Sequence, residues 1–542
     1  MGQKIKIAGW VSVGVIAGAL TTVSLQTVAR GAMTPLPLEE IQQLSAVFGL
    51  IKTDYVESVD DKKLITDAIS GMVSSLDPHS QYFDKKSYKE FREGTSGRFV
   101  GVGIEITQED GLIKVVSPIE GSPAFRAGLK TGDLITKIDD TAVKGLSLND
   151  AVKRMRGEPN TKVQLTILRK DESRSFPVTI TREEIKTQSV KGKVIEPGYG
   201  WIRLSQFQER TVDDFVRKVE ELYKQEPNMK GLVLDLRNDP GGLLDAAVAI
   251  SAAFLPPDVT VVSTNGQLAE SKETYKASPS FYARRGMGDP LQRLPASLKK
   301  LPLVVLVNEG SASASEIVAG ALQDYKRGTL MGSQTFGKGT VQTFVELPGG
   351  LSDVFPRGFG QLKVTIQKFY RINGGTTQLR GVEPDVVLPD VYDGIEQGEK
   401  EMDFHLAYDK IPAAAYQSYN PYKESQRRKA IELSKKRLSK NEYYALVQKR
   451  SAELAQVRNE YTYSLNMKKF EAQQEALRLQ DKPLRDYKYR TVCDTVMALQ
   501  GDLKEAGADA IKLAQKQDWL KRYREDAGLD EAVRILFDWS GK

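Results

Sequence analysis

The sequence predicts a multidomain α/β protein with helical regions at both ends of the chain. The first observation is length, because 542 residues exceed what one hydrophobic core normally accommodates. The second is composition, since 40% hydrophobic and 27% charged residues are ordinary for folded globular domains. The third is a change of pattern along the chain: helical periodicity, then short β runs, then strands alternating with helices, then charged helical sequence.

The first 30 residues have the composition of an export signal. Lys4 and Lys6 precede a run without charges over residues 7–28. A basic start followed by an apolar run is typical of a secretory signal, and this run is also long enough to span a bilayer. We therefore expect residues 1–30 to be either a cleaved signal peptide or a retained inner-membrane anchor. Either alternative places the remaining chain in the periplasm or another extracytoplasmic compartment.

A helical region is predicted over residues 36–94. Apolar residues recur at i, i+3 and i+4 in LEEIQQLSAVFGLIKTDY and in DKKLITDAISGMVSSL, and helical sequence is expected to continue to Glu93. The glycines from Gly94 to Gly97 then predict a break.

The second region, residues 97–184, contains β runs and one clear helix. GVGIEI, LIKVVSP, DLITKID and KVQLTILR are strand-like, and SLNDAVKRMR is a helix with Ser147 as its N-cap and Asp150 at the third position. VGVGIEI places two glycines before a strand, where backbone N–H groups can turn together towards a carboxylate. An edge strand beside a helix also accepts an extended peptide. The candidate peptide-binding residues are Val100, Gly101, Val102, Gly103 and Ile104.

With the AGLKTGDLI segment, this region resembles a PDZ domain over nearly its whole length. The resemblance implies capture of a free protein C-terminus, with an apolar terminal residue in the pocket below the glycine loop. The alternative is a small β-barrel whose glycines only make turns.

The third region, residues 185–395, alternates strands and helices, and residues 396–542 are charged and helical. GLVLDLR and PLVVLVN lack polar alternation, as expected of strands buried on both faces. Residues 421–470 carry 13 Lys/Arg against 5 Asp/Glu. A solvated helical face explains this excess better than binding to nucleic acid or anionic lipid. Cys493 is the only cysteine, so no intrachain disulfide forms, and a buried, inert thiol on an amphipathic helix is expected.

Three alternating serines occur where a strand becomes a helix, in EGSASASEIVAG. Ser313 and Glu316 have the spacing of a capping box, which explains Ser313 structurally. A helix N-terminus also favours the negative charge of a reacting oxygen, so a capping role and a catalytic role are compatible. Ser311 and Ser315 are expected to be structural.

A serine nucleophile needs a base, and the chain has few candidates. The two histidines, His79 and His405, lie in a turn near the N-terminus and at the edge of the C-terminal region, and both are disfavoured. Lys338 stands between two glycines in TFGKGTVQ, and burial among apolar neighbours would lower its pKa enough for it to act as a base. A glycine turn with an exposed lysine is the alternative.

The same segment must be weighed as a phosphate loop. GSQTFGKG lacks the Ser/Thr that binds Mg²⁺, because Gly339 stands in its place. The β-branched residues of TVQTFVEL predict a strand next, whereas a phosphate loop opens a helix. We therefore expect no nucleotide, metal or other cofactor.

GSASASEIVAGALQDY followed by GSQTFGKGTVQ resembles the signature of carboxyl-terminal processing proteases, a Ser–Lys family with a ClpP/crotonase-like core and an inserted PDZ domain. The resemblance implies Ser313 as nucleophile, Lys338, 25 residues later, as base, and Gln342 as the residue that orients the lysine. Strand alternation predicts that Lys338 and Gln342 share one face. LKVTIQKFYRINGGTTQLRGVEPDVVLP closely resembles the tail-specific branch, and the C-terminal region resembles it more loosely.

Backbone donors for an oxyanion are also predicted. The Ala314 N–H directly follows the nucleophile, and LDLRNDPGGLLDAA exposes the N–H groups of Gly241 and Gly242 at a helix start. The sequence does not choose between these two glycines.

The sequence therefore predicts an exported serine endopeptidase that binds apolar C-terminal tails and cleaves through an acyl-enzyme. Its partners would be protein substrates, with an adaptor or regulator and homo-oligomerisation as further expectations, and no nucleic acid. A catalytically inactive peptide-binding scaffold is the main alternative, disfavoured because Ser313, Lys338 and Gln342 are all present. A crotonase-type acyl-CoA enzyme is disfavoured by the export signal and the peptide-binding domain.

Overall fold

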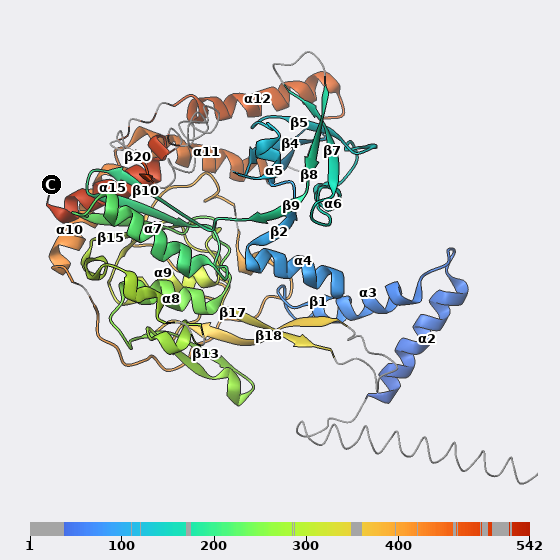
Figure 1. Cartoon of the computed structure of the whole chain (residues 1–542), viewed down its shortest axis with the longest axis horizontal. Coiled ribbons are helices and arrows are strands. Elements are labelled where there is room, and N and C mark those ends of the chain that lie inside the picture. Colours follow the sequence, from blue (N-terminus) through green and yellow to red (C-terminus); the bar gives the residue numbers. More distant parts are fainter. Residues whose placement is uncertain are drawn as a thin grey trace, which may run out of the picture. The chain divides into compact units, whose positions relative to one another are not determined.

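The computed structural model describes most of the chain after residue 36 (Figure 1). The described residues are 37–109, 111–119, 121–169, 175–284, 286, 288–347, 360–395, 397–419, 421–458, 462, 464–487, 489, 491, 497–500, 520 and 523–541. The predicted export segment and Cys493 lie outside them. The chain divides into two units, Met1–Met72 and Val73–Lys542. Within the described residues, no helix combines the length and apolarity that crossing a membrane requires.

The N-terminal region is mainly helical, as predicted, with two corrections. The helices are α2 (Leu38–Asp54), α3 (Asp61–Ser74) and α4 (Lys85–Ser96). Gln81–Phe83 is strand β1, not helix, because it pairs with a strand almost 300 residues later, and such a partner leaves no local periodicity. The helix also ends later than the expected Glu93: α4 runs through Gly94 to Ser96, and the break predicted over Gly94–Gly97 falls at its last residue, Gly97, whose φ is 70°.

The PDZ-like region forms a six-stranded antiparallel sheet with a separate two-stranded ribbon. The sheet order is β3-β4-β5-β7-β8, with β6 paired to β5, and β2 pairs with β9. Ser147 caps α6 as predicted, accepting the Asp150 N–H at 3.1 Å. The elements are β2 (Arg98–Gly101), β3 (Ile104–Glu109), β4 (Leu112–Pro118), α5 (Pro123–Arg126), β5 (Leu134–Ile138), β6 (Thr141–Ala142), α6 (Leu148–Met155), β7 (Lys162–Leu168), β8 (Phe176–Thr181) and β9 (Glu183–Lys186).

A seven-stranded sheet forms the centre of the large unit, in the order β19-β16-β15-β12-β11-β10-β20. β12 and β15 are parallel neighbours buried at every position, which confirms the prediction of strands covered on both faces. The strands are β10 (Val190–Glu196), β11 (Tyr199–Leu204), β12 (Gly231–Asp235), β15 (Leu303–Val307), β16 (Thr329–Gly332), β19 (Val386–Val387) and β20 (Met497–Ala498).

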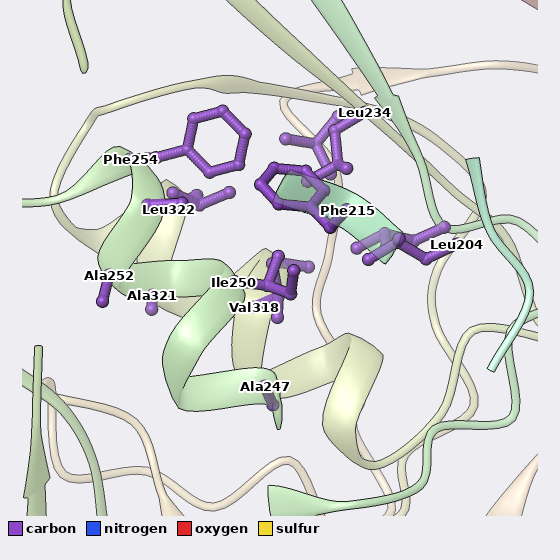
Figure 2. Close-up of a cluster of buried hydrophobic side chains, with 14 of the residues drawn as sticks. Leu204, Phe215, Leu234, Ala247, Ile250, Ala252, Phe254, Val318, Ala321 and Leu322 are labelled. Atoms are coloured by element: carbon purple, nitrogen blue, oxygen red, sulfur yellow. The ribbon is translucent and has the colours of Figure 1, made fainter. Parts of the chain in front are cut away.

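Helices cover the two faces of this sheet with separate apolar layers. α7 (Thr211–Gln225), α8 (Leu244–Phe254) and α9 (Ala314–Asp324) pack on one face, and α15 (Ala527–Ser540) packs on the other. Alternate residues of one strand reach opposite layers: Leu234 joins the first and Val233 the second. Figure 2 shows the first layer, where Ile250 of α8 and Val318 of α9 lie together beneath Leu234 and Phe215. The start of α9 is therefore held by a close-packed core.

A second, smaller sheet combines segments that are far apart in sequence. β18 (Gln361–Tyr370) pairs with β17 (Thr340–Glu346) on one side and with β13 (Thr260–Gly266) and β1 on the other. β14 (Glu273–Lys276) completes the sheet beside β13. The short 3₁₀ helices are η1 (Ala269–Ser271), η2 (Pro279–Phe281), η3 (Pro290–Arg293), η4 (Ala296–Lys300) and η5 (Glu399–Glu401).

The described part of the C-terminal region is mainly helical from α10 (Glu424–Leu438) onward, as predicted, with two corrections. The described residues before α10 have only the short helix η5, and Met497–Ala498, part of the segment expected to form a helix around Cys493, is strand β20, because it pairs with β10 of the central sheet. Besides α10 and α15 the region contains α11 (Glu442–Arg458) and α12 (Met467–Arg485). Part of its basic excess is neutralised internally: Arg437 reaches both Glu531 and Asp538 at 2.6 Å. Arg237, just after β12, bonds Asp526 at 2.7 Å and so ties this region to the core.

Candidate active site

The turn between β15 and α9 holds Ser313 in a strained backbone conformation. Ser313 has φ 55° and ψ −110°, which a residue with a side chain rarely adopts. Its two serine neighbours are fully buried, and they hold the turn. Ser311 Oγ donates to the Leu236 carbonyl at 2.8 Å, and Ser315 Oγ donates to the Asp239 carbonyl at 2.9 Å. These contacts fasten the turn to the loop after β12 and fit the structural roles predicted for both serines.

Lys338 lies in the loop before β17, and its amino group is well bonded. Its Nζ donates to the Thr340 carbonyl and to Gln342 Oε1, each at 2.9 Å. The shared face expected from strand alternation arises differently: Lys338 precedes the strand, and a bulge lies between Val341 and Gln342. Because a strand follows the loop, the phosphate-loop alternative is excluded.

Burial, together with the positive charge of Lys363, lowers the pKa of the Lys338 amine to about 8, although three carboxylates raise it. Those carboxylates belong to Glu399, Glu316 and Asp77. A substantial fraction of Lys338 is therefore neutral near pH 8, and the alternative of an exposed lysine is wrong.

Glu316 connects the serine turn to the lysine loop. One oxygen accepts from the Thr335 hydroxyl at 2.7 Å and the Gly337 N–H at 2.8 Å. The other accepts from the Ser313 N–H at 2.8 Å and the Lys338 N–H at 3.0 Å. Burial raises the pKa of this carboxyl to about 7, although these four hydrogen bonds lower it. In the sequence, Glu316 signalled only a capping box, of which the bond from the Ser313 N–H is one half.

The backbones of the two predicted dyad residues share this carboxylate, but their side chains are not bonded to each other. Among the described residues no hydrogen bond joins Ser313 Oγ to Lys338 Nζ, since both Nζ bonds go to Thr340 and Gln342. The structure thus brings Lys338 to Gln342, and links Ser313 to the lysine loop through the backbone.

The two glycines proposed as oxyanion donors differ in their bonding. A Cβ on Gly241 would lie 2.8 Å from the Ala314 nitrogen, so this glycine closely faces the nucleophile turn. However, the Gly241 N–H donates to Asp239 Oδ1 at 2.9 Å. Within the described residues the N–H groups of Gly242 and Ala314 have no acceptor. Of the three predicted donors, Gly242 and Ala314 are therefore the two that are unengaged among the described residues.

Neither histidine contacts Ser313. His79 Nε2 lies 2.7 Å from Glu399 Oε2, and His405 Nδ1 lies 2.8 Å from the Met402 carbonyl. In the described part of the chain there is also no cluster of side chains suited to a metal ion.

The peptide-binding residues predicted from sequence lie at the start of the PDZ-like sheet. Gly103 has φ 78°, and a Cβ there would lie 2.3 Å from Ser122 Cβ, so only glycine fits. Val102, beside it, is buried and its carbonyl accepts the Ala124 N–H at 2.9 Å. Val100 and Gly101 end β2, and Ile104 begins β3, which pairs with β4 only among the described residues. The glycine loop thus stands beside an unpaired strand edge.

Comparison with known proteins matches successive parts of the chain to four family models. These are peptidase family S41 over residues 198–388, a PDZ domain over 100–180, the C-terminal domain of tail specific protease over 392–541, and the N-terminal domain of the activating protease CtpB over 16–87.

Relatives and solved structures carry related names. A carboxy-terminal-processing protease of Bartonella bacilliformis is 40% identical over 402 residues, which are 72% of this chain and 87% of the relative. A probable CtpA-like serine protease of Staphylococcus aureus is 36% identical over 399 residues, 71% of this chain and 74% of the relative. The solved photosystem II D1 C-terminal processing protease is 32% identical and matches 63% of this chain and 86% of its own, with a TM-score of 0.36.

The class that these findings define is a serine-type peptidase with a PDZ domain. The chain belongs to the carboxy-terminal-processing proteases of peptidase family S41. The predicted fold class is confirmed: an S41-type α/β core with a PDZ domain and helical N- and C-terminal regions.

Proposed function

We propose that this protein is an extracytoplasmic endopeptidase that recognises apolar C-terminal tails and cleaves with a Ser313–Lys338 dyad. One observation carries the dyad: half-buried Lys338, with a pKa of about 8, has two hydrogen-bond acceptors at 2.9 Å. A neutral amine has two N–H bonds and one lone pair. With both N–H bonds used by Thr340 and Gln342, the lone pair remains for the Ser313 proton.

The chemistry then has two stages. Ser313 Oγ attacks the peptide carbonyl carbon while Lys338 takes its proton, and the carbonyl oxygen becomes an oxyanion. We assign the Ala314 and Gly242 N–H groups to stabilise it, since neither has another acceptor among the described residues. The lysine gives its proton to the leaving amine, which leaves an acyl-enzyme. In the second stage Lys338 takes a proton from a water molecule, whose oxygen attacks the ester carbonyl. The ester bond then breaks, and Lys338 returns the proton to Ser313 Oγ.

Peptide binding at the PDZ domain is proposed to bring the lysine within reach of the serine. Arg156, after α6, pairs with Glu93 of α4 at 3.1 Å. Phe91 of the same helix packs against Phe344 of β17, with ring centroids 5.0 Å apart. A shift of α6 on ligand binding would therefore reach the strand that carries the lysine loop.

The tail preference is proposed from the chemistry of the PDZ-like site. The Gly101–Gly103 loop offers backbone donors for a terminal carboxylate, and β3 offers a free edge for an added strand. Apolar residues Val102, Ala151 and Met155 belong to the same buried cluster and favour an apolar last side chain.

The extracytoplasmic location is proposed from residues 1–30 alone, as either signal peptide or membrane anchor. Secretion of a reporter fused to these residues tests it. A fusion protein found only in the cytoplasm would contradict the proposed location.

The activity test uses an unfolded protein ending in apolar residues, with a second version ending in aspartates. We expect wild type to cleave the first substrate faster, and Ser313→Ala and Lys338→Ala to lose about 10³-fold or more in kcat. Mass spectrometry of the products locates the cleavage. Wild-type cleavage in either variant would contradict the dyad, equal cleavage of both substrates would contradict tail recognition, and binding without cleavage would favour the scaffold alternative.

A further inference from the structure

Behind the catalytic lysine, a hydrogen-bond chain runs back to a carboxylate near the N-terminal end of the large unit. Lys338 Nζ donates to Gln342 Oε1 at 2.9 Å, and Gln342 Nε2 donates to Thr365 Oγ1 at 3.0 Å. The Thr365 hydroxyl donates to Asp77 Oδ1 at 3.0 Å. Asp77 is almost 300 residues from Thr365 in sequence, and it stands just before β1, which pairs with the same strand, β18.

Asp77 is in its ionised form and can only accept. It is 3% exposed, and burial alone would raise its pKa, but hydrogen bonds from Ser80, His79 and Thr365 hold the pKa below its usual value. Both oxygens are bonded, one of them to the Ser80 hydroxyl at 2.6 Å.

Because Asp77 can only accept, it determines which group donates in each hydrogen bond from Asp77 to Lys338. Thr365 has a single hydroxyl proton, and Asp77 takes it, so the hydroxyl oxygen is left as an acceptor. Gln342 must therefore turn its NH₂ group to Thr365 and its carbonyl oxygen to Lys338.

We propose that Asp77, acting through Thr365, is a positioning residue for the lysine base: it imposes the orientation of the Gln342 amide that leaves the Lys338 lone pair free. This rests on the proposed Ser–Lys function. With the opposite orientation, the amide would donate to the lone pair that has to receive the Ser313 proton. Asp77 touches neither the substrate nor the reacting atoms, so it acts only through the chain.

The segment around Asp77 is attached to β18 and to the lysine loop at further points, which keeps the carboxylate in place. Ser80 Oγ accepts the Thr365 N–H at 3.0 Å. His79 contacts Glu399, whose other oxygen accepts from Gln378 at 3.0 Å. Gln378 Oε1 in turn accepts the Gly339 N–H, next to the lysine, at 2.8 Å.

The test measures kcat, KM and the pH profile of the full-length protein on a fluorogenic peptide with an apolar C-terminus. In Asp77→Asn and Thr365→Val we expect plateau kcat to fall about 10- to 100-fold, with KM changed less than twofold. Thr365→Ser keeps the hydroxyl and should restore most of the rate.

The pH profile of kcat distinguishes a positioning role of Asp77 from a general loosening of the turn that contains it. The charges acting on Lys338 are Lys363, Glu399, Glu316 and Asp77, of which Asp77 raises its pKa. Removing that negative charge in Asp77→Asn moves the rising limb of kcat to lower pH, whereas Thr365→Val leaves it in place. Ser80→Ala is the control, because it loosens the same turn but keeps both Asp77 and Thr365.

Three results would overturn the proposal. They are wild-type kcat in both Asp77→Asn and Thr365→Val, a rate in Thr365→Ser as low as in Thr365→Val, and an equal loss in Ser80→Ala without any shift of the pH limb. Thermal unfolding identifies a variant that has lost its fold. If Asp77→Asn is such a variant, the comparison of Thr365→Val with Thr365→Ser tests the proposal instead. If Lys338→Ala instead retains activity, the proposed dyad itself fails, whatever the Asp77 variants do.

Discussion

The turn that carries Ser313 and the strand that follows Lys338 differ in how they are built. β15 is buried at every position and nine of the eleven residues of α9 are buried, so the serine stands on the close-packed core. β17 and β18 are mostly half-buried, and their sheet is completed by segments from distant parts of the chain. The core can hold the strained backbone of Ser313, which costs about 1–3 kcal/mol. The sheet of β17 and β18, which is less buried, can move slightly with the Lys338 loop at a smaller cost in stability.

Hydrogen exchange tests this difference without any mutation and should show the largest effect. Amides of β12 and β15 open only with the core, whereas those of β17 and β1 can open locally. We expect exchange in β17 and β1 to be at least about 10³-fold faster. Similar protection from exchange in the two sheets would show that the lysine-bearing sheet is as stable as the central sheet.

Glu316→Ala should disturb the Ser313 turn and the Lys338 loop at the same time. It leaves four donors without their acceptor, from Ser313, Thr335, Gly337 and Lys338, at a cost of roughly 3–5 kcal/mol. We expect a lower Tm together with loss of kcat. Arg98→Ala, which removes an exposed ion pair to Glu184, is the matched control and should change stability by less than about 1 kcal/mol. A Glu316→Ala protein with wild-type Tm would show that the bridge is unimportant.

Gly241→Ala acts on the serine side only. Gly241 has φ 94°, and a Cβ would lie 2.6 Å from the Ala312 carbonyl and 2.8 Å from the Ala314 nitrogen, so the nucleophile turn must shift. We expect kcat to fall about 10²-fold, as when an oxyanion donor is displaced. Gly128→Ala is the control, because its φ is 81° but nothing lies within 4 Å of the added carbon. Equal kinetic losses in the two variants would refute the steric explanation.

Lys363→Met acts on the lysine side and should have the smallest effect. The Lys363 charge lowers the pKa of Lys338, so removing it raises that pKa. The neutral fraction of Lys338 then appears at higher pH, and activity near pH 7 falls by up to about tenfold while the high-pH plateau is kept. Lys363→Arg keeps the positive charge, so the rise of kcat with pH should stay near pH 8. If the rise stays at the same pH in Lys363→Met, the charge of Lys363 does not set the pKa of Lys338.

The parts of the fold that were predicted correctly depend on local patterns. The continuous apolar runs of β12 and β15 and the Ser147 cap of α6 are visible within a few residues of sequence. The missed strand β1 and the misplaced end of α4 have the opposite origin: β1 forms because β18 lies beside it, and α4 tolerates Gly94 because Asp84 and Gly97 supply its caps.

The candidate site also has features that the local sequence predicts and features that depend on tertiary contacts. Residue type and context singled out the serine turn and Lys338, and the resemblance to carboxyl-terminal processing proteases singled out Ser313 and Gln342. They were not enough to choose between Gly241 and Gly242, because that choice depends on whether Asp239 occupies the N–H. The second role of Glu316 also stayed hidden, since its bonds to Gly337 and Lys338 cross 21 and 22 residues.

By itself, the sequence determined the family, the PDZ domain, the buried strands and the candidate nucleophile and base, because local residue patterns carry that information. Only the tertiary structure decided which groups surround the base. The pKa of Lys338 follows from burial and from four charges on different segments. The orientation of Gln342 follows from a chain of bonds that ends at Asp77. Electrostatics and hydrogen bonding depend on distance in space, which the linear order of residues does not contain.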